Sequence, residues 1–158
     1  MNISRKIVAA SISGTFFALI LGLIFPDPFG VKDVATFQSY FFSAVTSATI
    51  YMLYSFPVIL IYGVITSIVS DKIAEFITDK AGVKQVEIVV SGMMHIVFGL
   101  ILLWLSLGAS ILYFVTDRIL KARKNSYEWL DGLKSLSLPI VTWLILMAIV
   151  WGKEVIFT

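Results

Sequence analysis

A single histidine and a nearby serine are the side chains of this sequence that could most readily do chemistry. His95 is the only histidine and lies deep inside an uncharged stretch, where an ionisable group is a functional candidate by default. Ser91 lies four residues earlier, so on a helix the two share a face, as a nucleophile and its base would require. The simpler interpretation is a neutral histidine bonded to a neighbouring helix and a serine bonded to its own helix. Both interpretations stay open at this point.

Other catalytic or cofactor chemistry finds little support. The sequence has no cysteine, which excludes disulfides, thiolate metal sites and thiol nucleophiles. No second histidine accompanies His95 to complete a metal shell, and Glu87 lies eight residues away, about 12 Å along a helix. Phosphate loops, dinucleotide fingerprints and zinc-protease motifs do not occur. We therefore expect no catalytic residues, no cofactor, no metal and no enzyme activity.

The composition is that of a membrane protein. Of 158 residues, 59% are hydrophobic and 14% are charged, against roughly 45–50% and about 25% in soluble domains. A soluble chain of this length needs more polar residues to cover its surface. The net charge of +2 is too small to indicate binding to nucleic acid. Residues 1–158 are therefore predicted to form a single integral membrane domain whose partner is the lipid bilayer.

Four stretches without Lys, Arg, Asp or Glu approach or exceed the roughly 20 residues that a helix needs to cross a bilayer. They cover approximately residues 7–25, 39–70, 88–116 and 136–152. The fold class predicted is therefore all-α, a polytopic transmembrane bundle of four helices. The first stretch follows Arg5 and Lys6 but is longer than a signal-peptide core, so we expect it to be retained.

Local signals predict how these helices bend and end. Pro57 removes a backbone donor inside the second stretch, so a kink is expected there, as a packing feature or as a hinge. Amphipathic spacing beyond residue 70 indicates a helix that continues until Gly82 stops it. Similar spacing suggests that the third helix continues beyond residue 116. Asn125, followed by Glu128, fits the start of a new short helix.

The orientation in the membrane is undecided by the sequence. With four spans, each side receives six basic residues, so the positive-inside count is tied. If the third stretch were re-entrant, the second and third loops would lie on the side of the N-terminus. The count would then be ten basic residues against two.

Small residues recur at helical spacing and predict close helix packing. One ridge repeats every four residues along the first stretch: Ala10, Gly14, Ala18 and Gly22. Small side chains let helix backbones approach closely in lipid, so the ridge is predicted to pack inside the bundle, with a homodimer contact as the alternative. A second set repeats every seven residues along the third stretch: Gly92, Gly99 and Ser106.

The second stretch carries a resemblance to a known family. The segment PVILIYGVITSIVSDKI, preceded by YFFSAVTSATIYMLYSF, resembles small bacterial membrane proteins grouped as uncharacterised protein family 0715. The similar positions are Pro57, Tyr62, Gly63, Ser67, Ser70 and Asp71. The resemblance covers about a third of the chain. It implies a four-helix plan and a multi-pass location in the bacterial cell (plasma) membrane, and it brings no activity or functional residues.

Two hypotheses of function follow. The first is a non-enzymatic interaction or accessory protein whose helices contact lipid, another membrane protein or a second copy of the chain. It is favoured because little charge lies inside the predicted spans. The second is a subunit of a small oligomeric transporter or channel, with His95, Ser91 and the region near Pro57 lining a path. Transport would require several intramembrane polar groups that face one cavity.

Overall fold

A computed structural model describes residues 2–30, 35–82, 85–101, 104–124 and 126–157, and these residues are almost entirely helical, without a strand. The prediction of an all-helical bundle is confirmed. The elements are α1 (Ile3–Ile24), α2 (Phe37–Val58), the π-helical segment η1 (Ile59–Gly63), α3 (Val64–Ala81), α4 (Gln85–Ile101), α5 (Trp104–Arg123), α6 (Trp129–Ser135) and α7 (Ser137–Phe157).

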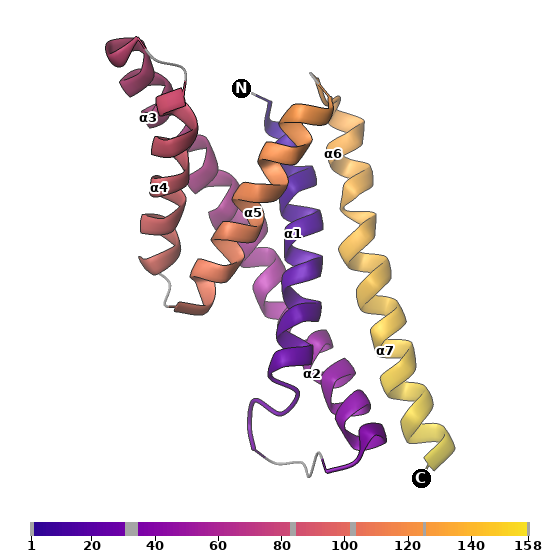
Figure 1. The fold of residues 1–158 in the computed structure, drawn as a ribbon. Helices are drawn as coiled ribbons and strands as arrows, with labels where there is room; N and C mark the ends of the chain where they lie inside the picture. The colour runs from indigo at the N-terminus through magenta and orange to yellow at the C-terminus, as the bar shows by residue number, and fades with distance from the viewer. Residues whose placement is uncertain (1, 31–34, 83–84, 102–103, 125, 158) are drawn as a thin grey trace.

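The expected number of four helices is wrong, because these elements join into five rods (Figure 1). α2, η1 and α3 form one rod, and α6 continues into α7. Among the described residues, three rods are long and apolar enough to cross a bilayer: Ile3–Ile24, Phe37–Lys80 and Trp129–Val155. α4 and α5 are the other two rods, and α4 is apolar but shorter. The fold is therefore compatible with a membrane protein of three spans.

The third predicted span, over residues 88–116, is instead an antiparallel hairpin of α4 and α5 (Figure 1). The hydroxyl group of Ser110 donates to the carbonyl oxygen of His95 at 2.5 Å, which pairs residues on opposite sides of the turn. Nearer the other end of the hairpin, Lys121 Nζ on α5 donates a hydrogen bond to Glu87 Oε1 on α4. The hairpin thus leaves and returns on the side where α1 begins (Figure 1).

Small residues explain why α4 and α5 can pack so closely. A Cβ atom at Gly99 would lie 2.9 Å from the Cβ atom of Ser110 and 3.1 Å from the Cα atom of Leu107. At Gly92 a Cβ atom would touch the ring of Phe114. Two members of the seven-residue repeat therefore face α5 inside the hairpin, where larger side chains would separate the helices.

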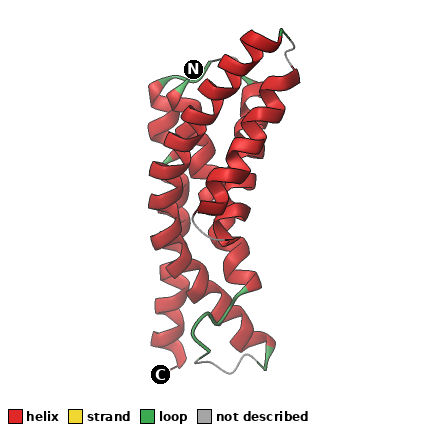
Figure 2. Cartoon of the chain, turned by 90° about the vertical axis from the view of Figure 1, so that its left-hand side faces the viewer, coloured by secondary structure: helices red, strands yellow, loops and turns green. Residues whose placement is uncertain are grey.

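α1 runs through the middle of the bundle and packs against α2, α3, α5, α6 and α7, as Figures 1 and 2 show. Its small-residue ridge is buried, with Ala10 and Ala18 at 0% exposure. At Gly22 a Cβ atom would lie 2.6 Å from the Cβ atom of Ala48 on α2, so these two backbones are almost in contact. The ridge therefore packs within the chain.

Helix irregularities follow the local signals only in part. Pro57 lies near the end of α2, and the helix continues past it through η1. Because proline has no N–H, one helical hydrogen bond is lost, and the π-helical segment takes up the change in register. Gly82 ends α3 with φ of 68°, a left-handed conformation that favours glycine, as predicted.

The short helix predicted between the third and fourth stretches exists, but it starts later than expected. α6 begins at Trp129, and Glu128 is its N-cap, in a reciprocal hydrogen-bond pair with Asp131. Asn125, the predicted start, lies outside the described residues. Asn2 donates to the carbonyl oxygen of Tyr127 at 2.9 Å, so this connection is fastened to the start of α1.

Candidate functional site: a buried charge cluster beside an apolar pocket

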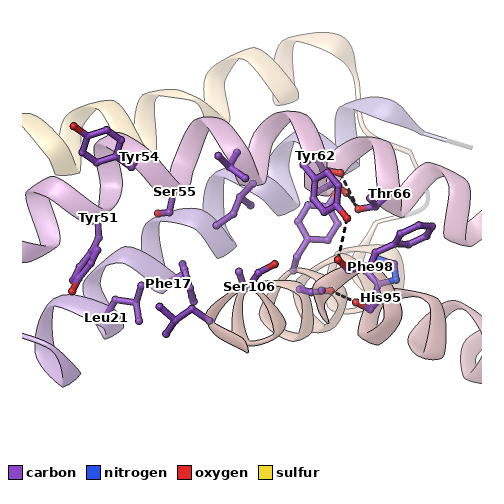
Figure 3. A pocket seen from close by; sticks show the side chains of 18 residues that line it. Phe17, Leu21, Tyr51, Tyr54, Ser55, Tyr62, Thr66, His95, Phe98 and Ser106 are labelled. Atoms are coloured by element: carbon purple, nitrogen blue, oxygen red, sulfur yellow. Dashed lines mark hydrogen bonds between the residues drawn. The ribbon is translucent and has the colours of Figure 1, made fainter. Parts of the chain in front are cut away.

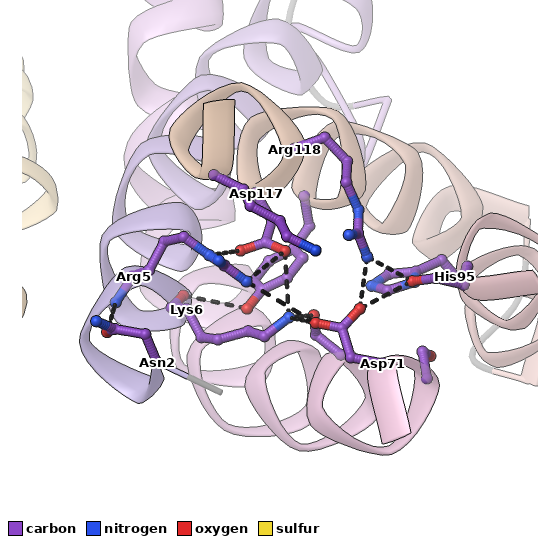
Figure 4. Close-up of polar contacts among 12 residues, drawn as sticks. Asn2, Arg5, Lys6, Asp71, His95, Asp117 and Arg118 are labelled. Carbon is purple, nitrogen blue, oxygen red and sulfur yellow. Dashed lines mark hydrogen bonds and ion pairs between the residues drawn. The ribbon is translucent and has the colours of Figure 1, made fainter. Parts of the chain in front are cut away.

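Charged residues from the ends of three apolar stretches meet near the start of α1 (Figure 4). Asp117 on α5 is 1% exposed and is the first centre of this cluster. It accepts a hydrogen bond from Arg5 Nε at 2.8 Å and one from Lys6 Nζ at 3.1 Å. Lys6 is itself fully buried, at 0% exposure. Two adjacent cations of α1 thus share one carboxylate of the hairpin.

Asp71 on α3 is the second centre of the cluster. It pairs with Lys6 from one side and accepts a hydrogen bond from Arg118 Nη2 at 2.5 Å from the other. Ser91 on α4 donates to the same carboxylate at 3.0 Å and accepts from Arg118 Nη2 at 2.7 Å. The cluster therefore connects α1, α3, α4 and α5.

The composition of the cluster explains how charge can be buried there. Three cations, Arg5, Lys6 and Arg118, face two carboxylates, Asp71 and Asp117. Isolated buried charges are costly, whereas paired and hydrogen-bonded ones are tolerated. Each carboxylate here has at least two cationic partners. The cluster fixes the hairpin against the first and second spans.

His95 is buried at 4% exposure between the cluster and the interior of the bundle. Its Nδ1 lies 2.8 Å from the backbone carbonyl oxygen of Ser91, so Nδ1 carries the hydrogen and donates. Its Nε2 has no hydrogen-bond partner among the described residues. The ring stacks against Tyr113, with 6.1 Å between centroids. His95 bonds to its own helix, which differs from the predicted bond to a neighbouring one.

His95 and Ser91 share a helix face, as the sequence predicts, but their side chains have different partners. The hydroxyl group of Ser91 is engaged by Asp71 and Arg118, and His95 contacts only the backbone of Ser91. Among the described residues, the serine hydroxyl group and the imidazole ring are not hydrogen-bonded to each other. The pair consequently lacks the arrangement of a serine nucleophile and its base.

Two more exposed ion pairs lie on the same side of the molecule, and the first adjoins the cluster, because Glu87 also lies 3.9 Å from Arg118 Nη1. Lys121 donates to Glu87 at 2.9 Å, and Lys124 donates to Asp131 at 2.8 Å. The hydrogen bond to Asp131 raises the pKa of Lys124 above its usual value, so this lysine stays charged at neutral pH. Exposed pairs of this kind contribute little to stability.

An apolar pocket of about 380 Å³ lies beside the cluster, between α1, the α2–η1–α3 rod and the hairpin (Figure 3). We call it the central pocket. Six aromatic side chains line it: Phe17, Tyr51, Tyr54, Tyr62, Phe98 and Tyr113. Five polar side chains also line it: Ser55, Thr66, His95, Ser106 and Ser110. Aliphatic and small residues complete its wall: Leu21, Val58, Ile59, Gly63, Gly99, Leu105 and Ala109. Its volume falls within the roughly 300–1,000 Å³ of small-molecule sites.

A second hollow, of about 510 Å³, lies on the other side of α5. We call it the apolar groove. It runs along α1 from Phe25 to Phe17 and along α5 from Leu105 to Val115. Its lining consists of apolar side chains and one glycine, Gly108. The groove and the central pocket share Phe17, Leu21 and Leu105.

Comparison with known proteins adds no relative to these observations. No family model, curated protein or solved structure matches the chain.

Sequence reasoning missed the cluster because its members lie just beyond the uncharged stretches. Arg5 and Lys6 precede the first stretch, Asp71 follows the second, and Asp117 follows the third. Each therefore falls outside the predicted spans, and the scarcity of charge inside those spans favoured a protein partner. The structure overturns that premise, since Lys6 and Asp117 are among the most buried side chains described. The helical continuation past residues 70 and 116 was the signal that could have placed these charges inside the bundle.

Proposed function

We propose that the chain is a non-enzymatic, multi-pass protein of the bacterial plasma membrane that binds a small lipophilic molecule in its central pocket. The observation that carries this proposal is the pocket itself, whose wall is mostly aromatic and aliphatic and comes from four rods of the bundle. Such pockets, with a few polar groups among apolar ones, are the usual form of a small-molecule site. Membership of uncharacterised protein family 0715 is proposed with it, on the segment from Pro57 to Asp71.

The contacts of the polar residues support binding over catalysis. Ser91 donates its hydroxyl hydrogen to a carboxylate that is already paired with two cations, which makes that carboxylate a poor base. His95 uses Nδ1 on its own backbone. The three longest apolar rods also present many exposed aliphatic side chains, which suit lipid. A second membrane protein or a second copy would suit the same faces, and we favour no single surface for either.

Photocrosslinking tests the pocket directly. A diazirine-bearing palmitic acid, added to the protein purified in a mild detergent, is expected to crosslink to α2, α4 and α5 at residues that line the pocket. The variant Ser106→Trp places an indole where a small side chain lines the cavity, so it should reduce crosslinking at least fivefold. Mass spectrometry of the crosslinked peptides measures both effects.

The matched control is Gly152→Trp on α7, where a new side chain meets nothing within 4 Å. This variant should crosslink like the wild type. Crosslinks spread evenly over all exposed apolar helices, and unchanged in Ser106→Trp, would contradict the proposal.

A transporter or channel subunit is the second candidate function, and one observation favours it. Several hydroxyl groups and His95 line a single cavity, and the buried charge cluster lies next to it. Polar groups that converge at membrane depth are characteristic of transport paths. Uptake of a lipophilic cation into vesicles that contain the protein would favour this candidate over simple binding.

We further propose an orientation, on the premise that the hairpin is re-entrant. The sequence count for that arrangement is ten basic residues on the side of the N-terminus against two on the other side. The positive-inside rule then places the N-terminus in the cytoplasm and the C-terminus outside.

Single-cysteine labelling measures this orientation without background, because the chain has no cysteine of its own. In intact cells, a membrane-impermeant maleimide should label cysteines at positions 32 and 158 and spare those at positions 84 and 124. A four-span topology would instead label positions 32 and 124 and spare position 158. Labelling at positions 32 and 124 together, with position 84 spared, would therefore refute the re-entrant hairpin.

A further inference from the structure

The α4–α5 hairpin stops short of the far side of the bundle. Asp117 belongs to the cluster near the start of α1, and Trp104 begins α5 near the turn. These two residues are 13 positions apart, which corresponds to roughly 20 Å of helix, and α5 is tilted, so this part of the hairpin spans less than the roughly 30 Å of a hydrocarbon core (Figure 1). α1 continues towards Ile24 past the end of the hairpin, whose last contribution beside it is around Leu105. Something apolar has to fill the volume beyond the hairpin in a bilayer.

Both hollows have lining residues in this region. The central pocket begins at Leu21 and Tyr51 and continues up to His95. The apolar groove begins at Phe25 and continues up to Val115. They meet at Phe17, Leu21 and Leu105, so the end of α5 lies between them.

We infer that a single two-chain lipid from the leaflet on the C-terminal side occupies both hollows, with one acyl chain in the central pocket and the other in the apolar groove. The inference rests on the proposed function and names the class of molecule that is bound. Two apolar channels that start together and separate around Leu105 match two chains that start from one head group. A single-chain molecule would fill only one of them.

The head group then lies near the end of α1 on the C-terminal side. Exposed aromatic side chains gather on that half of α2, where Tyr40 donates to the carbonyl oxygen of Leu23 at 2.5 Å and Tyr51 donates to that of Phe25 at 3.3 Å. Tyrosines are typical of the level at which head groups meet hydrocarbon. The buried charge cluster is at the other end of α1, so it takes no part in holding this head group.

The first test is the stoichiometry of lipid bound to the wild-type protein. Native mass spectrometry of the detergent-purified chain, with added dipalmitoyl phosphatidylglycerol, should detect one retained lipid. With the single-chain lysophosphatidylglycerol, the same protein should retain two. One retained molecule of each kind would overturn the inference, because it would mean a single-chain site.

Two matched variants then assign the chains to the hollows. Ser106→Trp fills the central pocket, and Gly108→Trp fills the groove, where a Cβ atom has room 3.7 Å from the ring of Phe17. Each variant should lose at least fivefold in retention of the two-chain lipid and keep one molecule of the single-chain lipid. Gly152→Trp, on the open face of α7, should behave like the wild type.

These outcomes separate the inference from the proposed function. If Ser106→Trp abolishes retention while Gly108→Trp leaves the two-chain lipid bound, the central pocket binds a molecule that does not extend into the groove. The two-chain lipid is then wrong and the proposed function stands. If neither variant changes retention, both fail. The stoichiometry of the wild type decides the inference even if a variant does not fold.

Discussion

Replacing Asp117 by Asn is expected to cost about 3–5 kcal/mol of the free energy of unfolding, the usual effect of removing one partner of a buried ion pair. Asp117 is 1% exposed, and its loss leaves Lys6, at 0% exposure, with Asp71 as its remaining carboxylate. Arg5 then keeps only a 3.9 Å contact with Asp71. Titration with sodium dodecyl sulfate in mixed micelles, followed by circular dichroism, measures the change.

A second substitution tests whether uncompensated positive charge causes the loss. In the double variant Lys6→Met/Asp117→Asn, the fully buried cation is removed as well, so the double variant should be more stable than Asp117→Asn alone. The matched control is Lys121→Met, which breaks an exposed pair with Glu87 and should change stability by less than about 1 kcal/mol. Losses that simply add in the double variant would mean that the cluster does not act through charge balance.

Replacing Gly22 by Leu is expected to cause the other large loss, because it would force α1 and α2 apart. The new Cβ atom would lie 2.6 Å from Ala48 Cβ and 2.7 Å from the carbonyl oxygen of Ala44, and a backbone atom cannot rotate away. Overpacking of this kind costs typically about 1–3 kcal/mol, and the backbone contacts place Gly22→Leu at the upper end. The same unfolding titration measures it.

Gly152→Leu is the matched control for this prediction. It introduces the same side chain into a helix at a position with nothing within 4 Å, so stability should be unchanged or slightly higher, since leucine favours helix more than glycine does. The double variant Gly22→Leu/Ala48→Gly should recover part of the loss, because it removes one of the clashing atoms. Equal stability of Gly22→Leu and Gly152→Leu would mean that α1 and α2 are not in close contact.

The sequence predicts the parts of this fold that depend on local pattern. The length of the stretches without charged residues identifies the long apolar rods. Gly82 ends α3 as expected. The spacing of Gly14 and Gly22 marks the face of α1 that α2 covers. In each case a short stretch of chain carries the whole signal. The physical reason is that helix length, helix termination and backbone approach are decided by a few neighbouring residues.

The hairpin could not be predicted in the same way. Residues 88–116 are uncharged throughout and long enough for one span, and the turn between α4 and α5 falls among apolar residues without a proline or a charge. The sequence there carries no cluster of Gly, Pro, Asn or Asp, which are the residues by which turns are recognised. Gly99, together with Ser106 and Ser110, was visible as a packing pattern, but spacing alone does not reveal which helix it packs against.

The candidate site depended on contacts between distant parts of the chain, and so it escaped prediction. Lys6 pairs with residues 65 and 111 positions later, and no local pattern links them. His95 was correctly singled out as a buried polar side chain, but its partner proved to be its own backbone. The central pocket is formed by side chains from several rods and has no signature within any one of them.

The pairing of Lys6 with Asp117 also constrains the order of events while the chain is being made. Lys6 is synthesised before both of its carboxylates, because Asp71 follows it by 65 residues and Asp117 by 111. At about 5–20 residues per second, Asp117 arrives roughly 6–20 seconds after Lys6. We expect the full set of ion pairs around Lys6 to form only once the α4–α5 hairpin has been synthesised.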